Sequence, residues 1–286
     1  MNFTGERFVP ELEGWIALQH YHRYYFVLNQ LDLTDKVVLD IACGEGFGSY
    51  LLAKSSKFVI GVDISEETIL HANKKYSTSN INFLVGNAAS IPLESNSTDI
   101  IVSFETLEHH NKHDEMMQEI KRVLKENGVL IISSPDKGYY DKYLPSLTNE
   151  YHVKELFNQE FKELMCRYFQ FAHFFIQNNV IGSFIANEEE NITYKRPLNI
   201  EKKSGKSEKI EPRFNICISS NYEMQFSSSI SICSPTLFYD IFSTGSVQDI
   251  TIQKQKILLD NIYRSYTWKI GKLITFLIKK IMKLFK

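Results

Sequence analysis

Short, almost uninterrupted apolar runs recur along the first half of this chain and limit its fold more than any other feature. Each run is rich in β-branched residues, and longer amphipathic segments separate it from the next. The runs are KVVLDIA (36–42), FVIGVDI (58–64), INFLVG (81–86), DIIVSFE (99–105) and GVLIISSP (128–135). Strands buried on both faces have this composition, and strands that alternate with helices form a parallel sheet through right-handed crossovers. The pattern predicts a doubly wound α/β domain.

Helix signals mark the segments between the runs. SEETILHANKKY (65–76) has Ser65 placed as an N-cap. DEMMQEIKRVLKENG (114–128) is expected to remain helical until Gly128. Much later, the strand-like FNICISS (214–220) suggests that the chain returns to the sheet.

Changes in composition divide the chain into an arm at 1–34, a main domain at 35–245 and a helical tail at 246–286. Within the main domain, residues 186–212 are rich in Glu, Lys, Ser and Asn, which is typical of a long mobile insertion.

Composition excludes several classes of protein. The 286 residues carry 32 basic and 34 acidic side chains, a net charge of −2, so no bulk charge favours nucleic acid. The 4 cysteines show neither CxxC nor zinc-ligand spacing, which argues against a disulfide framework or a structural metal. The charged start MNFTGERFVPELEG argues against a signal peptide, and no apolar stretch approaches the roughly 20 residues that span a membrane. A cytoplasmic location is expected.

The turn after the first run is rich in glycine and is preceded by an acid. In VVLDIACGEGFGSYLLA (37–53), Asp40 precedes Gly44, Gly46 and Gly48. Glycines at a strand-to-helix turn let a ligand approach the backbone, but a dinucleotide fingerprint would read G-x-G-x-x-G rather than G-x-G-x-G. Asp63 follows Asp40 by 23 residues, the place of an acid that accepts ribose hydroxyls. A carboxylate at position 40 suits an amino group, so the motif predicts an adenosyl ligand with a charged aminoacyl end and no diphosphate.

These motifs, taken in order, resemble the class I methyltransferases that use S-adenosylmethionine. The resemblance covers roughly 1–240 and rests on LDIACGEGFGS, GVDIS, Asn87-Ala88, IPLESNSTDIIVSFETLEHH and EIKRVLKENGVLIISSPDK. It implies a seven-stranded sheet, completed by FFIQNN (174–179) and FNICISS, with S-adenosylmethionine as cofactor. The glycine turn would hold the aminoacyl part and Asp63 the ribose. The family usually has Asp at position 87, facing adenine, so here that contact falls to the amide oxygen of Asn87 and the backbone of Ala88.

The arm adds a further resemblance. WIALQHYHRYYFVLNQLDL (15–33) predicts an aromatic helix with Arg23 beside Tyr24. The pattern GERF…HxHRY is similar to the entry of methyltransferases from bacterial surface-glycan gene clusters, which implies a lid over the cofactor; a helix packed on the core is the alternative. The residues expected to bind S-adenosylmethionine are Arg23, Tyr24, Asp40, Ala42, Gly44, Gly46, Gly48, Asp63, Ile64, Asn87, Ala88 and Glu105.

Histidines supply the candidates for catalysis. Methyl transfer is an in-line displacement, and a hydroxyl acceptor also needs a base that works near neutral pH. His109 is the first candidate, with Glu105 or Glu108 to orient it. His152, in an N-x-x-H-x-x-E run that similar enzymes share, is the second. The alternatives are a packing or capping role for His109 and an exposed position at a helix start for His152.

A metal is not expected. His109, His110 and His113, with Asp114 nearby, have the residue types of a metal site. The family resemblance requires no metal at this position, so the chain is expected to bind none.

The tail SYTWKIGKLITFLIKKIMKLFK (265–286) carries lysines and no acid, and its apolar residues repeat every three or four positions. This pattern is typical of a helix that lies on an anionic membrane surface; packing on the protein or on a partner helix is the alternative. DITIQKQKILLDNIYRS (249–265) precedes it and is compatible with a homodimer contact.

The expected function is methylation of a hydroxyl on a sugar of a surface polysaccharide, its lipid-linked precursor or a nucleotide sugar. The alternatives are N-methylation of an amino sugar, methylation of a quinone-like or other lipid, and a scaffold that has the fold without turnover. A nicotinamide-dependent dehydrogenase is disfavoured because the third glycine of this chain is misplaced for the dinucleotide fingerprint.

Overall fold

The computed structural model describes residues 15–143, 149–180, 182–187, 193–194, 208–209, 212–224 and 226. The chain divides into two compact units, 1–234 and 235–286. The second unit, and with it the expected membrane helix and dimer contact, lies outside the described residues, as do residues 1–14 and most of 186–212.

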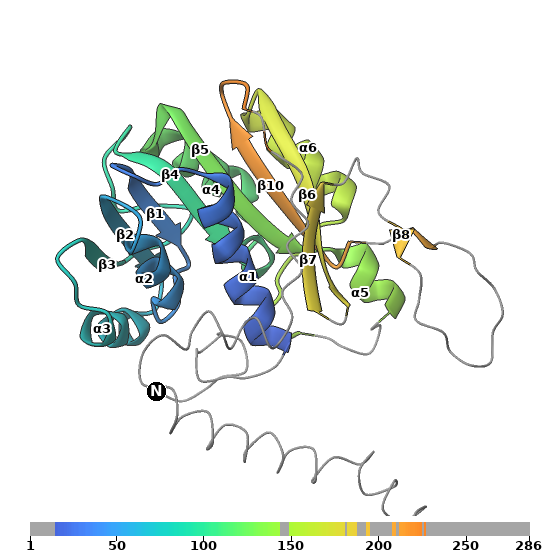
Figure 1. Cartoon of the computed structure of the whole chain (residues 1–286), viewed down its shortest axis with the longest axis horizontal. Coiled ribbons are helices and arrows are strands. Elements are labelled where there is room, and N and C mark those ends of the chain that lie inside the picture. Colours follow the sequence, from blue (N-terminus) through green and yellow to red (C-terminus); the bar gives the residue numbers. More distant parts are fainter. Residues whose placement is uncertain are drawn as a thin grey trace, which may run out of the picture. The chain divides into compact units, whose positions relative to one another are not determined.

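The elements alternate as the sequence predicts (Figure 1). The helices are α1 (Trp15–Gln30), α2 (Phe47–Ala53), α3 (Glu66–Lys75), the 3-10 helix η1 (Leu107–His109), α4 (His113–Val123), α5 (Lys137–Tyr143) and α6 (Asn158–Tyr168). The strands are β1 (Val37–Ile41), β2 (Phe58–Asp63), β3 (Ile81–Val85), β4 (Thr98–Phe104), β5 (Leu124–Pro135), β6 (Phe171–Val180), β7 (Gly182–Asn187), β8 (Thr193–Tyr194), β9 (Glu208–Lys209) and β10 (Phe214–Ser220). Ser65 caps α3 as expected, because its side chain accepts a hydrogen bond from the backbone N–H of Thr68.

The main sheet has the order β3-β2-β1-β4-β5-β10-β6-β7. The pairs from β3 to β5 are parallel, whereas β10 runs antiparallel to both β5 and β6. The chain moves outward from β1 to β3 and then returns beside β1 as β4. The carboxyl ends of β1 and β4 therefore flank the point where the strand order reverses, which is where doubly wound sheets bind their ligands.

Alternate side chains of the strands enter two apolar clusters, one on each face of the sheet. Val38 and Ile131 belong to the cluster that α1 and α2 complete, whereas Leu39 and Leu130 belong to the cluster that α4 and α6 complete. Helix α1 thus lies on the sheet as one layer of the core, and the aromatic helix of the arm packs there from Ala17 onward.

One strand is additional to the sequence prediction, and one helix boundary differs from it. The expected seven strands are present, and β7 adds an eighth at the edge beside β6. The prediction of a helix continuing to Gly128 is wrong, because α4 ends at Val123 and β5 begins at Leu124. The carbonyls of Arg122 and Val123 accept hydrogen bonds from the backbone N–H groups of residues 96 and 97, and Leu124 pairs with the start of β4. Sheet pairing outweighs the local helical preference of this segment.

Candidate active site

The glycine turn after β1 is held in the left-handed backbone region. Ala42, Gly44 and Gly46 have φ values of 55°, 55° and 90°. A Cβ at Gly46 would lie 2.6 Å from the ring of Phe83, so glycine is required there by packing as well as by conformation. At Gly44 a Cβ would meet nothing within 4 Å. The turn is therefore closed toward β3 and open at Gly44, where a ligand could approach the backbone.

Asp63 joins this turn to the end of β2. One of its carboxylate oxygens accepts the backbone N–H of Gly44 at 3.0 Å, and the other accepts that of Ser65 at 2.9 Å. Each carboxylate oxygen has a second lone pair, so these bonds leave acceptor capacity for a pair of hydroxyls. The next residue, Ile64, is 68% exposed. Asp63 thus lies at the glycine turn with an exposed apolar side chain next to it, and the expected contacts of Asp63 and Ile64 with the cofactor stay predictions.

Asp40 lies behind the turn rather than on its open side. Its carboxylate is fully buried and accepts hydrogen bonds from the hydroxyls of Ser49, at 2.6 Å, and Tyr24, at 3.1 and 3.2 Å. Burial raises the pKa of Asp40 to about 7, although these two bonds oppose the rise. The expected contact between Asp40 and the amino group of the cofactor stays a prediction.

Tyr24 also explains Gly48. A Cβ at Gly48 would lie 1.9 Å from the ring of Tyr24, so the space that this glycine leaves is filled by the side chain from α1. The structure therefore gives Gly48 a packing reason to be glycine, and its expected contact with the cofactor stays a prediction.

The end of β3 places Asn87 and Ala88 at the same edge of the sheet. Asn87 is exposed, and its side-chain oxygen already accepts the backbone N–H of Ala89 at 2.8 Å. This is the oxygen that was predicted from the sequence to contact adenine. A hydrogen bond to adenine would have to share that oxygen or use the backbone.

Arg23 extends to the end of β4, whereas Tyr24 lies near the end of β1. Its side chain is 1% exposed, with Nη2 3.4 Å from Glu105 and Nε donating to Gln177 at 2.8 Å. Glu105 follows β4 with φ 51° and also accepts the Ser133 hydroxyl at 2.6 Å. Helix α1 therefore braces the end of β4 through this ion pair, whereas the sequence expected both residues to contact the cofactor, and that contact stays a prediction.

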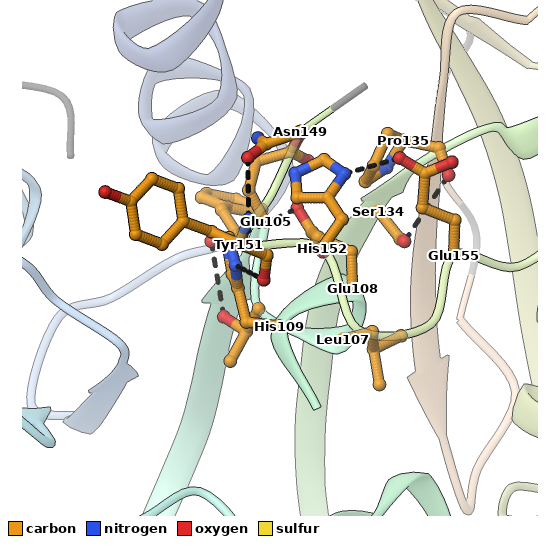
Figure 2. A network of polar contacts seen from close by, with 12 residues as sticks. Glu105, Leu107, Glu108, His109, Ser134, Pro135, Asn149, Tyr151, His152 and Glu155 are labelled. Carbon is orange, nitrogen blue, oxygen red and sulfur yellow. Dashed lines mark hydrogen bonds and ion pairs between the residues drawn. The ribbon is translucent and has the colours of Figure 1, made fainter. Parts of the chain in front are cut away.

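The two candidate bases, His109 and His152, face each other across the end of β4, with ring centroids 5.2 Å apart (Figure 2). Nδ1 of His109 lies 3.2 Å from the carbonyl oxygen of Tyr151, and Nδ1 of His152 contacts the Glu155 carboxylate. Neither Glu105 nor Glu108 orients His109 through its Nδ1. Backbone N–H groups of residues 153 and 154 donate to the carbonyl of Glu108 at 2.7 and 3.1 Å and so hold the two segments together.

Glu108 lies beneath the histidine pair. It is 1% exposed, and its Oε1 is 3.9 Å from Nε2 of His109. Burial, reinforced by the nearby Glu105 carboxylate, raises the pKa of Glu108 well above its ordinary value.

The rings of His110 and His113 lie 5.5 Å apart, but His109, His110 and His113 do not form a group of candidate metal ligands. Nε2 of His113 is 2.8 Å from the carbonyl oxygen of Leu107, and Nδ1 of His110 accepts the backbone N–H of Lys112. His113 instead lines a cavity of about 670 Å³ between α4 and α6, in whose lining neither Gly44 nor Asp63 takes part.

Three polar residues of the site were missed by sequence reasoning. Ser49, Ser133 and Gln177 complete the hydrogen bonds of Asp40, Glu105 and Arg23. Ser49 directly follows the third glycine and could have been found from that position. The other two lie on β5 and β6, and only the strand order brings them to the site.

Comparison with known proteins identifies the class. Residues 33–204 match the methyltransferase domain family, so the chain belongs to it. A protein of Mycolicibacterium smegmatis named "probable S-adenosylmethionine-dependent methyltransferase" is 33% identical over 57% of this chain and 62% of its own length. A protein of the same description from Mycobacterium tuberculosis is 30% identical over 58% and 60%. A ubiquinone biosynthesis O-methyltransferase of Coxiella burnetii is 30% identical over 47% and 58%.

A solved structure shares the fold. The YcgJ protein of Bacillus subtilis matches with a TM-score of 0.54 and 18% identity, over 72% of this chain and all of that one. The expected class I S-adenosylmethionine-dependent methyltransferase, its fold and its cofactor are confirmed at the level of the family. The match spans about 60% of the length of the first two curated relatives, so the acceptor and the partners are matters of proposal. Among the described residues, no helix is both long and apolar enough to cross a membrane.

Proposed function

We propose that this protein transfers the methyl group of S-adenosylmethionine to a hydroxyl of a sugar, in a surface polysaccharide, its lipid-linked precursor or a nucleotide sugar. The observation that supports a hydroxyl acceptor is the pair His109 and His152, whose ring centroids lie 5.2 Å apart beyond the end of β4. The proposal that the acceptor is a sugar rests on the similarity of the GERF…HxHRY arm to methyltransferases of glycan gene clusters.

The reaction requires an acceptor oxygen in line with the methyl group and the sulfur. As the oxygen attacks the methyl carbon, the sulfonium leaves as a neutral thioether and the hydroxyl loses its proton. A backbone carbonyl can only accept a hydrogen bond, so Nδ1 of His109 donates to Tyr151 and Nε2 carries the lone pair. The contact between Nδ1 of His152 and Glu155 favours the same tautomer. Either imidazole can therefore accept the proton of an acceptor hydroxyl at Nε2.

A quinone-like or lipid acceptor is the second candidate. The relative from Coxiella burnetii is named as an O-methyltransferase of ubiquinone biosynthesis, which also places the methyl group on a hydroxyl. The histidine pair suits a phenolic hydroxyl as well as a sugar hydroxyl, so the two candidates are separated by measuring which acceptor is methylated.

The test is a panel of acceptors incubated with the full chain and S-adenosylmethionine. Release of S-adenosylhomocysteine with nucleotide sugars or lipid-linked glycans, together with a methylated product in the mass spectrum, would support the sugar. Turnover with a catechol-type quinol alone would support the second candidate. Turnover with amino sugars that persists after His109→Ala and His152→Ala would contradict a hydroxyl acceptor, because a neutral amine needs no strong base.

The basic tail is proposed to place the enzyme on an anionic membrane surface. This proposal rests on its lysines and its apolar repeat alone. Flotation with vesicles of phosphatidylglycerol and phosphatidylcholine tests it: the full chain should float, and the chain ending at Ser265 should not. Equal flotation of the two proteins would contradict it.

A further inference from the structure

A buried carboxylate oxygen without a hydrogen-bond partner lies beside the histidine pair. Oε2 of Glu108 has no partner in the described part of the chain, although the residue is only 1% exposed. A buried acceptor is costly to leave unpaired, so it points to a group that the described part of the chain does not supply.

Two imidazoles lie near the carboxylate of Glu108. One ligand atom each from Glu108, His109 and His152 lies within 4.8 Å of the others. Two ligands that are each about 2.1 Å from a shared ion lie at most about 4.2 Å apart. Nε2 of His109 and Oε1 of Glu108 are 3.9 Å apart and already meet this limit. Atoms as far apart as 4.8 Å would have to approach by at least about 0.6 Å, which small side-chain rotations can provide.

The surroundings orient both histidines as metal ligands. A metal-binding histidine commonly donates its other ring N–H to a carboxylate or a backbone carbonyl. Here Nδ1 of His152 contacts the Glu155 carboxylate, and Nδ1 of His109 is 3.2 Å from the carbonyl of Tyr151. The backbone bonds from residues 153 and 154 to Glu108 fix the His152 segment against η1 before any ion arrives.

We propose that Glu108, His109 and His152 form a binding site for one divalent transition-metal ion, such as Zn²⁺ or Co²⁺. Two nitrogen ligands and one carboxylate favour these ions over Mg²⁺ and Ca²⁺, which prefer oxygen. The site replaces the grouping of His109, His110 and His113 that the sequence offered and departs from the expectation of no metal. Three protein ligands leave a coordination position open, as in catalytic metal sites.

The consequence for catalysis rests on the proposed function, but the binding itself does not. An acceptor hydroxyl at the open position would ionise more easily, because a bound cation stabilises the alkoxide, and its proton would pass to solvent water since the Nε2 lone pairs of both histidines would be held by the ion. The histidine pair would then activate the acceptor by holding the ion.

The test is a titration of the untagged, metal-free full chain with Co²⁺, followed by its visible absorption bands and by calorimetry. One equivalent should bind with bands typical of nitrogen ligands, and Zn²⁺ should displace it. His152→Ala, in a partly exposed loop, should weaken binding at least 30-fold, and Glu108→Gln should do the same. His110→Ala is the matched control and should bind like the wild type.

The proposal is overturned if the wild type binds no stoichiometric Co²⁺, or if His152→Ala binds as tightly as His110→Ala. His152→Ala decides the result if Glu108→Gln fails to fold. An assay of S-adenosylhomocysteine release with hydroxyl acceptors on the same samples separates this proposal from the function: binding of the ion without methyl transfer to any hydroxyl acceptor would contradict the function alone.

Discussion

The hydroxyl of Tyr24 lies 3.1 and 3.2 Å from the two carboxylate oxygens of Asp40, and this contact joins α1 to the glycine turn. Burial and the nearby Asp40 charge raise the pKa of Tyr24 well above its ordinary value, so the hydroxyl stays protonated and donates. The ring of the same residue fills the space above Gly48. A substitution at any one of these three residues should therefore alter the packing or the hydrogen bonds of the other two.

The stability of the ligand-free protein should depend on the charge of Asp40. Its pKa is raised from 3.8 to about 7 in the folded state, so the folded protein holds a proton that the unfolded chain releases. The stabilisation is fully present below about pH 4 and is lost as the pH rises to about 7. Urea unfolding of the wild type and of Asp40→Asn should show a smaller loss of stability from pH 5 to pH 8 in the variant. The same pH slope in both proteins would contradict the buried, protonated carboxyl.

Two glycine substitutions should separate packing from ligand access. Gly48→Ala would place a Cβ 1.9 Å from the Tyr24 ring, so the free energy of unfolding should fall by about 2–4 kcal/mol. Gly44→Ala meets no neighbour, and its φ of 55° should cost about 1 kcal/mol, but its Cβ should obstruct the cofactor. Unfolding curves and calorimetry with S-adenosylmethionine measure the two effects. A more severe loss of stability for Gly44→Ala than for Gly48→Ala would be inconsistent with the structure.

The ion pair between Arg23 and Glu105 should matter more than one at the surface. Arg23 is 1% exposed and Glu105 is 17% exposed, so Glu105→Gln leaves a buried guanidinium without its counter-charge and should cost about 2–4 kcal/mol. Glu119→Gln, which breaks the more exposed pair with Arg122, is the control and should cost about 1 kcal/mol or less. Denaturant unfolding compares the two, and equal losses would show that α1 is not anchored through Glu105.

The histidine pair should affect turnover and not cofactor binding. His109→Ala and His152→Ala should each lower kcat by about 100-fold or more, because a group that activates the acceptor contributes on that scale. His110→Ala should change kcat by less than about threefold, since its ring is directed to His113 instead. Initial rates with the identified acceptor measure this, alongside Kd values for S-adenosylmethionine that should match the wild type. Unchanged kcat in both variants would remove the pair from catalysis.

The features that were predictable from the sequence are those set by neighbours along the chain. The apolar runs gave β1 to β5, and the Ser65 cap gave the start of α3. The spacing of Asp40, the glycines and Asp63 predicted a turn between strand and helix with Asp63 beside it, because a strand end and its turn are local. The end of α4 and the edge strand β7 depend on pairing with other strands, which no local pattern reports.

The candidate catalytic cluster was predictable only in part. His109 and His152 were both named, but nothing in the sequence shows that they face each other, since the backbone bonds that join residues 153 and 154 to Glu108 form only in the folded chain. For the same reason Glu108 was read as a residue that orients His109, and its buried, unpaired oxygen came from the structure.

The binding of S-adenosylmethionine at the turn between Gly44 and Asp63 is the claim on which the enzymology depends. Calorimetric titration of the full chain with S-adenosylmethionine tests it, with Asp63→Ala as the variant and Asp99→Ala, at the opposite end of the sheet, as the control. The wild type and the control should bind one equivalent, and Asp63→Ala should bind at least 10-fold more weakly while it remains folded. No heat with folded wild-type protein, or equal affinity in all three proteins, would contradict the cofactor site.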